Sequence, residues 1–66
     1  MPSKGKVRDA EELIRKDGWF LIRSRSGSHR QFIHPEKPGK VTLPGKPNDD
    51  MHPATWDSVM RQAGLK

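Results

Sequence analysis

The sequence predicts a small two-layer α+β domain in which two helices cover one face of a three-stranded antiparallel sheet, in the order α-β-β-β-α. Three observations lead to this prediction. Apolar residues recur at helical spacing near both ends of the chain, whereas the middle alternates with a period of two. Glycines and prolines lie at the junctions between these segments, where they mark turns. Amphipathic helices and a sheet with one apolar face pack together as two layers.

The first helix is expected over residues 7–17. Its apolar positions recur with the spacing of one helical face: Val7, Ala10, Leu13 and Ile14. Acidic residues come early in this segment and basic residues late, which complements the helix dipole. Gly18 follows where a left-handed residue commonly ends a helix, so the helix is expected to stop there.

Two strands, residues 19–25 and 29–34, are expected to form a hairpin around Ser26 and Gly27. Alternation puts one set of first-strand side chains on a common face: Trp19, Leu21 and Arg23. The opposite face then carries the others: Phe20, Ile22 and Ser24. On the second strand, one face holds Arg30, Phe32 and His34, and the other holds His29, Gln31 and Ile33. The histidines of this strand are therefore expected to point in opposite directions.

The third strand is expected over residues 40–43, which are β-branched in part and bounded by Pro44. A turn-rich segment then leads to Pro53, a residue suited to the first turn of a helix. That last helix is expected to run to Ala63 and to be closed by Gly64. Its apolar stripe consists of Trp56, Val59, Met60 and Ala63.

The composition limits the class of protein. The chain has 66 residues, no cysteine and a formal net charge of +5, which predicts one basic, soluble domain over residues 1–66, folded from about 7 to 65 with frayed ends. Disulfides and thiolate metal sites are excluded, so the cytoplasm is the expected location. The longest apolar run, residues 19–22, is far too short to be a signal sequence or to span a membrane.

The positive charge lies in the middle of the chain. Residues 1–18 carry five basic and four acidic side chains, residues 48–66 carry two and three, and residues 19–47 carry six and one. A surplus of this kind gives one surface a positive potential, as expected of a protein that meets phosphate backbones. A solubilising face and a surface for an acidic protein partner are equally compatible with the same charge.

The sequence disfavours metal and acyl-transfer chemistry. A metal site needs several converging ligands, whereas His29 and His34 are expected on opposite faces and lie in no metal-binding motif. Ser28 is adjacent to His29 on a strand and so is expected to point the other way, which excludes a Ser-His relay. Asp49, Asp50 and His52 precede a helix, where capping or solvation is their expected role.

His29 is the remaining candidate for catalysis. It follows a small turn and is near three arginines in sequence: Arg23, Arg25 and Arg30. Imidazole titrates near neutrality, so a histidine beside phosphate-binding arginines can take the 2′-hydroxyl proton of RNA and allow that oxygen to attack phosphorus. This reaction needs no metal, and DNA would not undergo it. On residue type alone, a surface or turn histidine without catalytic function is an open alternative.

Several segments resemble the signature of the HicA toxin family over roughly residues 7–65. They are Asp17-Gly18-Trp19, Gly27-Ser28-His29-Arg30-Gln31-Phe32, His34-Pro35, Val41-Thr42-Leu43-Pro44-Gly45-Lys46-Pro47 and Arg61-Gln62-Ala63-Gly64-Leu65. Each segment is short, but their order in a chain of this length is specific. One departure is Ala54-Thr55-Trp56, where many members begin the last helix with glycine-threonine-leucine; this affects the expected antitoxin interface more than the chemistry.

The resemblance implies a double-stranded-RNA-binding-domain-like fold and a metal-independent mRNA interferase that inhibits translation. It implies that the family's essential histidine is His29, with Gly27 and Ser28 shaping the turn that exposes it. It also implies a HicB-type antitoxin that masks the active site, and no cofactor. Contacts with RNA are expected from charge clustering alone at Arg23, Arg25, Arg30, Lys40 and Lys46.

Two other functions remain open. A non-catalytic RNA-binding module of the same fold would bind RNA without cleaving it. A protein-binding adaptor would use the basic face for an acidic partner and would have no affinity for RNA.

Overall fold

The computed structural model describes residues 5–25 and 29–66. For residues 23–25 it describes the backbone alone. The predicted turn at Ser26, Gly27 and Ser28 lies outside the described residues. The elements, in chain order, are β1 (Gly5–Lys6), α1 (Val7–Asp17), β2 (Phe20–Arg25), β3 (His29–Ile33), β4 (Val41–Leu43), β5 (Asp50–Met51) and α2 (Pro53–Gln62). The predicted α+β fold is confirmed, with two short strands added.

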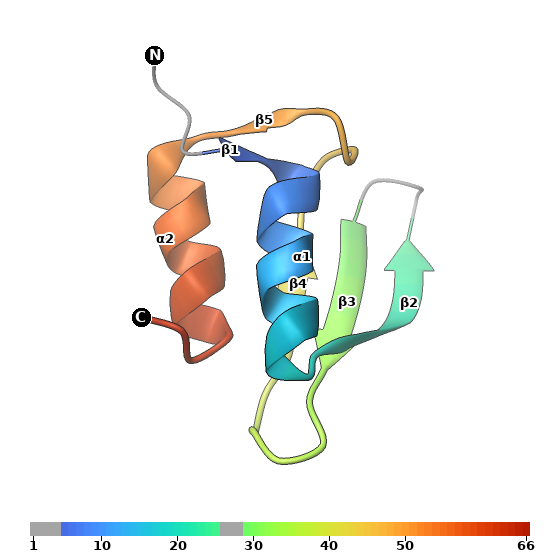
Figure 1. Ribbon diagram of the computed structural model, residues 1–66. Helices are drawn as coiled ribbons and strands as arrows, with labels where there is room; N and C mark the ends of the chain where they lie inside the picture. The colour runs from blue at the N-terminus through green and yellow to red at the C-terminus, as the bar shows by residue number, and fades with distance from the viewer. Residues whose placement is uncertain (1–4, 26–28) are drawn as a thin grey trace.

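The main sheet is antiparallel in the order β2-β3-β4. Its register pairs Arg25 with His29 at one end and Phe32 with Val41 near the other. The two helices pack over this sheet, and β2 lies on the side away from α2 (Figure 1). One face of the sheet is therefore covered by helices.

The core joins both layers. Its buried residues come from α1, α2, β3, β4 and adjoining positions: Val7, Ala10, Ile14, Trp19, Phe32, Val41, Leu43, Met51, Val59, Met60 and Ala63. Trp19 also donates its indole N–H to the backbone oxygen of Ala63 at 3.2 Å, which ties the start of the hairpin to the end of α2. No polar residue is buried within the described ranges. The domain is thus held together by apolar contact between the helices and the strands β3 and β4.

Two short strands, β1 and β5, form a second sheet that the sequence does not reveal. Each has two residues, too few for any alternation to be visible. The loop before β5 accepts hydrogen bonds from the first amides of α1: Val7 donates to the Asp49 oxygen at 2.9 Å and Arg8 to the Pro47 oxygen at 3.1 Å. This pairing satisfies N–H groups that a helix start leaves without intrahelical partners.

The expected alternation along β2 is wrong beyond its third residue. The register shifts between Leu21 and Arg23, where the pairing advances by two residues along β2 but by only one residue along β3. Leu21 pairs with Phe32, but Arg23 pairs with Gln31, which belongs to the other face of β3. An inserted residue of this kind is a β-bulge, and it reverses the faces that follow it. Leu21 and Arg23 therefore do not occupy the same face of the register.

Candidate functional site

His29 is the first residue of β3, and its side chain is exposed. The backbone register places it opposite Arg25 at the end of the sheet where β2 finishes. In Figure 1 this is the upper end of β3, next to the segment that leaves β4. His29 is therefore accessible from solvent at one end of the sheet.

His34 has a structural role instead. Its Nδ1 accepts hydrogen bonds from the backbone N–H groups of Glu36 at 2.9 Å and Lys37 at 3.1 Å. The ring proton must therefore be on Nε2, which lies 2.6 Å from the Asp17 backbone oxygen and donates to it. The ring also packs edge-on against Trp19, with 5.3 Å between centroids. His34 lies just after the end of β3 and joins the end of α1 to the β3–β4 turn.

Lys37 accounts for part of the basic surplus in the middle of the chain. Its Nζ donates to the Asp17 carboxylate at 2.6 Å and to the Ala63 backbone oxygen at 3.1 Å. The hydrogen bond from Lys37, together with its positive charge, lowers the pKa of Asp17. This lysine links α1 to the end of α2, and its charge is paired within the fold.

Arg30 lies on the helix-facing side of the sheet. Its Nη1 donates to Glu11 at 2.5 Å, and the other oxygen of Glu11 accepts from Arg15 Nε at 2.8 Å. The side chains of Arg30 and Glu11 are only 14% and 16% exposed. Nη2 of Arg30 is buried and has no hydrogen-bond partner among the described residues. Arg30 is thus directed toward α1, whereas His29, one residue earlier, is exposed.

The remaining predicted cations divide between the two ends of the sheet. Lys46 is exposed in the loop after β4, and Leu43 of that strand pairs with Arg30, so this lysine follows β4 toward the end where His29 lies. Lys40 is also exposed, but it precedes Val41, which pairs with Phe32. Phe32 is three residues from His29, about 10 Å along a strand. Lys40 therefore lies near the opposite end of the sheet.

The positions of Arg23 and Arg25 are known from the backbone alone. They pair with Gln31 and His29 respectively, so β2 brings both into the part of the sheet that begins at His29. Their side chains, and the whole of Gly27 and Ser28, lie outside the description of the structure.

The acidic segment before α2 supports the backbone. His52 Nδ1 accepts from the Ala54 N–H at 3.1 Å and caps the start of α2. An Asp49 carboxylate oxygen accepts from the Lys46 N–H at 3.0 Å, and Asp50 pairs with Lys6 at 3.1 Å. The prediction of capping is confirmed for His52. Over residues 5–25 and 29–66, no group of three His, Cys, Asp or Glu side chains is placed to hold a metal ion.

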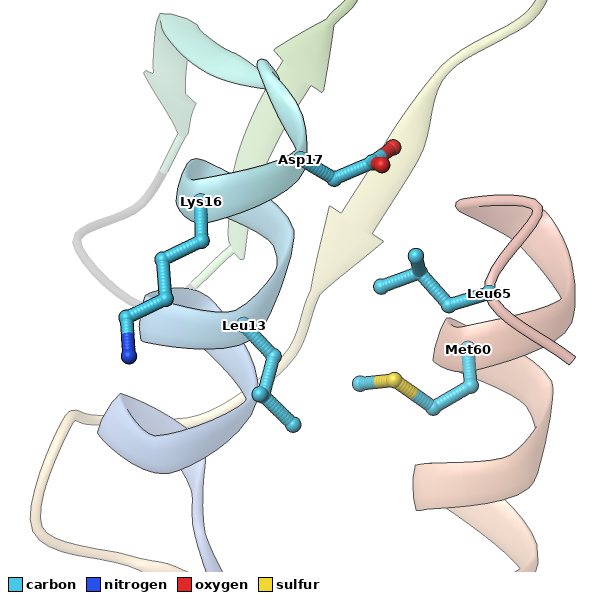
Figure 2. A pocket seen from close by; sticks show the side chains of 5 residues that line it. All are labelled: Leu13, Lys16, Asp17, Met60 and Leu65. Carbon is cyan, nitrogen blue, oxygen red and sulfur yellow. The ribbon is translucent and has the colours of Figure 1, made fainter.

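A hollow of about 400 Å³ lies between the two helices. Figure 2 shows the five side chains around it, from α1, from α2 and from the segment that follows α2: Leu13, Lys16, Asp17, Met60 and Leu65. None of these belongs to β3 or to the predicted site. The exposure of Leu13 was not predicted, since its helical spacing assigned it to the buried stripe.

None of the described helices combines the length and apolar character needed to cross a membrane. A search of curated proteins finds no match to the chain. A family model described as the HicA toxin of bacterial toxin-antitoxin systems matches residues 7–65.

Proposed function

Because the chain belongs to the HicA toxin family of bacterial toxin-antitoxin systems, we propose that it is a metal-independent mRNA interferase that inhibits translation in the cytoplasm and uses His29 as its essential group. A HicB-type antitoxin neutralises it by masking the region around His29. The chain is a single domain: the family model matches residues 7–65, and the pairing of β1 with β5 extends the folded part to Gly5.

The observation that carries this proposal is the position of His29 in the sheet. His34 and His52 each accept backbone N–H groups, at a turn and at the start of a helix. His29 is exposed at the end of a strand, beside the register position of Arg25. An accessible imidazole at the basic end of a sheet is suited to proton transfer near a phosphate.

The proposed reaction is transesterification followed by release of the downstream RNA. His29 takes the proton of a ribose 2′-hydroxyl, and the 2′-oxygen forms a bond to the adjacent phosphorus while the bond from phosphorus to the 5′-oxygen breaks. The products are a 2′,3′-cyclic phosphate and a 5′-hydroxyl, whose proton comes from solvent or from a general acid. Cations near the phosphate stabilise the charge that develops on its oxygens.

Four of the predicted cations are assigned to RNA contact. Arg23, Arg25 and Lys46 belong to the end of the sheet that carries His29, and Lys40 reaches a phosphate farther along the strand. We assign Arg30 a different role, because its guanidinium is already bound by Glu11. It positions β3 against α1 and so supports the residue next to it.

The experiment compares RNA with 2′-O-methyl RNA of the same sequence, using wild type, His29→Ala and His52→Asn. The last variant is the matched control, because asparagine removes an imidazole but keeps an acceptor for the helix cap. We expect His29→Ala to lower the rate of RNA cleavage by about a hundredfold to ten-thousandfold. His52→Asn should retain activity, and the methylated substrate should not be cut by any variant.

Cleavage of the methylated RNA, or full activity of a folded His29→Ala variant, would contradict the proposal. Binding of RNA without cleavage by wild type would support the non-catalytic RNA-binding module. About four phosphate contacts would then give a slope near −3 for log affinity against log salt. Binding to an acidic protein with no affinity for RNA would support the adaptor.

A further inference from the structure

The strand β2 forms one edge of the main sheet. In the order β2-β3-β4 it pairs with β3 on one side, and no strand of the described residues pairs with its other side. Figure 1 shows β2 on the outside of the sheet, beyond β3 and away from α2. The opposite edge is different, because the Thr42 N–H of β4 donates to the Gln62 side chain at 3.2 Å. β2 therefore offers the more open edge to another chain.

This edge carries three consecutive exposed apolar side chains. Phe20, Leu21 and Ile22 are 44%, 40% and 46% exposed, and they account for most of the large apolar side chains exposed in the described part of the chain. Phe20 pairs with Ile33 and Leu21 with Phe32, so the exposed apolar groups occupy both faces of the sheet. Single exposed apolar residues are common, but a consecutive apolar run on an open edge is a template for strand addition.

The second half of β2 differs from residues 20–22 in charge and geometry. The register shift begins after Leu21, and the strand then contains Arg23 and Arg25. No acidic residue occurs in β2. Charges on an edge discourage pairing with a further like-charged strand, and a bulge discourages regular pairing where it occurs. A strand added here is therefore favoured when it is apolar beside residues 20–22 and acidic beyond them.

We propose that the outer edge of β2 pairs with an extended strand of the partner antitoxin, apolar beside residues 20–22 and acidic beside Arg23 and Arg25. This inference rests on the proposed function insofar as an antitoxin neutralises the chain. A second copy of the chain fits the edge less well, because each copy has a net charge of +5 and would bring its own arginines to the contact.

Strand addition also provides a route to the masking of His29. Neighbouring strands lie about 4.8 Å apart, so an added strand lies about 10 Å from β3. Because Arg25 pairs with His29, a partner chain that continues past Arg25 passes the end of the sheet where β3 begins. The same antitoxin segment that binds the edge thereby leads into the region of the proposed active site.

The test measures the affinity of the purified cognate antitoxin for wild type, Ile22→Lys and Leu13→Lys. Leu13 is the matched control, because it is 42% exposed, almost as much as Ile22, but lies in the hollow between the helices. We expect Ile22→Lys to weaken binding by at least about tenfold, because a lysine on the edge opposes strand addition. Leu13→Lys should stay within about threefold of wild type, and both should cleave RNA as wild type does.

Amide hydrogen exchange of the unmodified complex provides a measurement that does not depend on a variant. Within residues 20–22, the amides whose N–H groups point away from β3 should gain protection on antitoxin binding, because strand addition pairs them. Unchanged exchange at these residues would overturn the inference, as would wild-type affinity of a folded Ile22→Lys variant. If Leu13→Lys lost as much antitoxin affinity as Ile22→Lys, the antitoxin would bind at the hollow between the helices instead. If the chain formed dimers and Ile22→Lys dissociated them, the edge of β2 would be the contact with a second copy.

The proposed ribonuclease activity and the proposed docking edge of β2 can be refuted independently of each other. If wild type does not cleave RNA but Ile22→Lys loses antitoxin binding, the ribonuclease assignment is wrong and the docking edge stands. If His29→Ala abolishes cleavage but Ile22→Lys binds the antitoxin normally, the edge is wrong and the ribonuclease assignment stands.

Discussion

Replacing Glu11 by alanine is expected to destabilise the domain more than any other change to a surface carboxylate of α1. Glu11 accepts hydrogen bonds from both Arg15 and Arg30. Arg15 is exposed and lies one helical turn away, so its pair contributes about 0.3–0.5 kcal/mol. Arg30 is only 14% exposed, and one of its terminal nitrogens already has no partner among the described residues. Loss of Glu11 would leave this guanidinium largely buried without its carboxylate.

The magnitude follows from that burial. Removing one partner of a fully buried ion pair costs about 3–5 kcal/mol. Because Glu11 and Arg30 are 16% and 14% exposed, water relieves part of the penalty, and we expect a loss of about 2–3 kcal/mol. At about 0.05–0.15 kcal/mol per residue, a 66-residue domain has a total stability of about 3–10 kcal/mol. The variant should therefore lose a large fraction of its stability.

Urea unfolding followed by tryptophan fluorescence measures this loss. Glu12→Ala is the control, because Glu12 pairs with Lys16 at 3.5 Å and both side chains are well exposed, so its effect should stay within about 0.5 kcal/mol. Glu11→Ala combined with Arg30→Met should cost less than the sum of the single changes, by about 1–2 kcal/mol, since the double variant leaves no buried charge without a partner. A Glu11→Ala effect within about 0.5 kcal/mol of wild type, or strict additivity, would refute the structural role of this pair.

Two further predictions concern the end of α1. The pKa of Asp17 is lowered by Lys37, so the pair stabilises the fold above the unfolded carboxyl pKa of about 3.9, and this contribution is lost as the pH falls through the folded value. Wild type should therefore lose stability between about pH 5 and 3 more steeply than Asp17→Asn in urea titrations, and equal slopes would contradict the pairing. Gly18→Ala should lower the Tm more than Gly39→Ala, although both glycines have positive φ. The reason is that a Cβ added at Gly18 would lie 2.7 Å from His34 Nε2, whereas a Cβ added at Gly39 would meet nothing within 4 Å. Equal shifts in Tm would show that the close approach to His34 carries no cost.

Local patterns predicted the helices and the inner strand well. The apolar spacing and the glycine after it gave the bounds of α1, and Gly18 has the left-handed φ of 112° that ends the helix. Alternation along β3 separated buried Phe32 from exposed His29. These features depend on the spacing of neighbouring residues, which a single sequence contains.

Features that depend on distant segments were missed. The pairing of β1 with β5 joins Lys6 to Asp50, and neither two-residue strand has a pattern of its own. The bulge after Leu21 inserts one residue without a glycine or proline to mark it. Tertiary pairing decides both features, so local propensity cannot reveal them.

In the candidate site, too, local sequence predicted some features and contacts with distant segments decided the others. His29 was chosen from its neighbours in sequence, and the structure places it exposed at the end of a strand. Arg30 was grouped with it by charge, but its partner Glu11 is 19 residues away on another element, and no local signal connects the two. Charge clustering also grouped Lys40 with Lys46, although the register of β4 places them near opposite ends of the sheet. Charge clustering therefore selects basic residues without showing where the fold places them.

The most direct measurement is cleavage of a long unstructured RNA by the purified chain in excess EDTA, with wild type and a folded His29→Ala variant side by side. We predict that wild type cleaves the RNA under these conditions and that the variant does not. Cleavage by wild type only when EDTA is omitted, or equal cleavage by both proteins, would contradict a metal-independent reaction at His29.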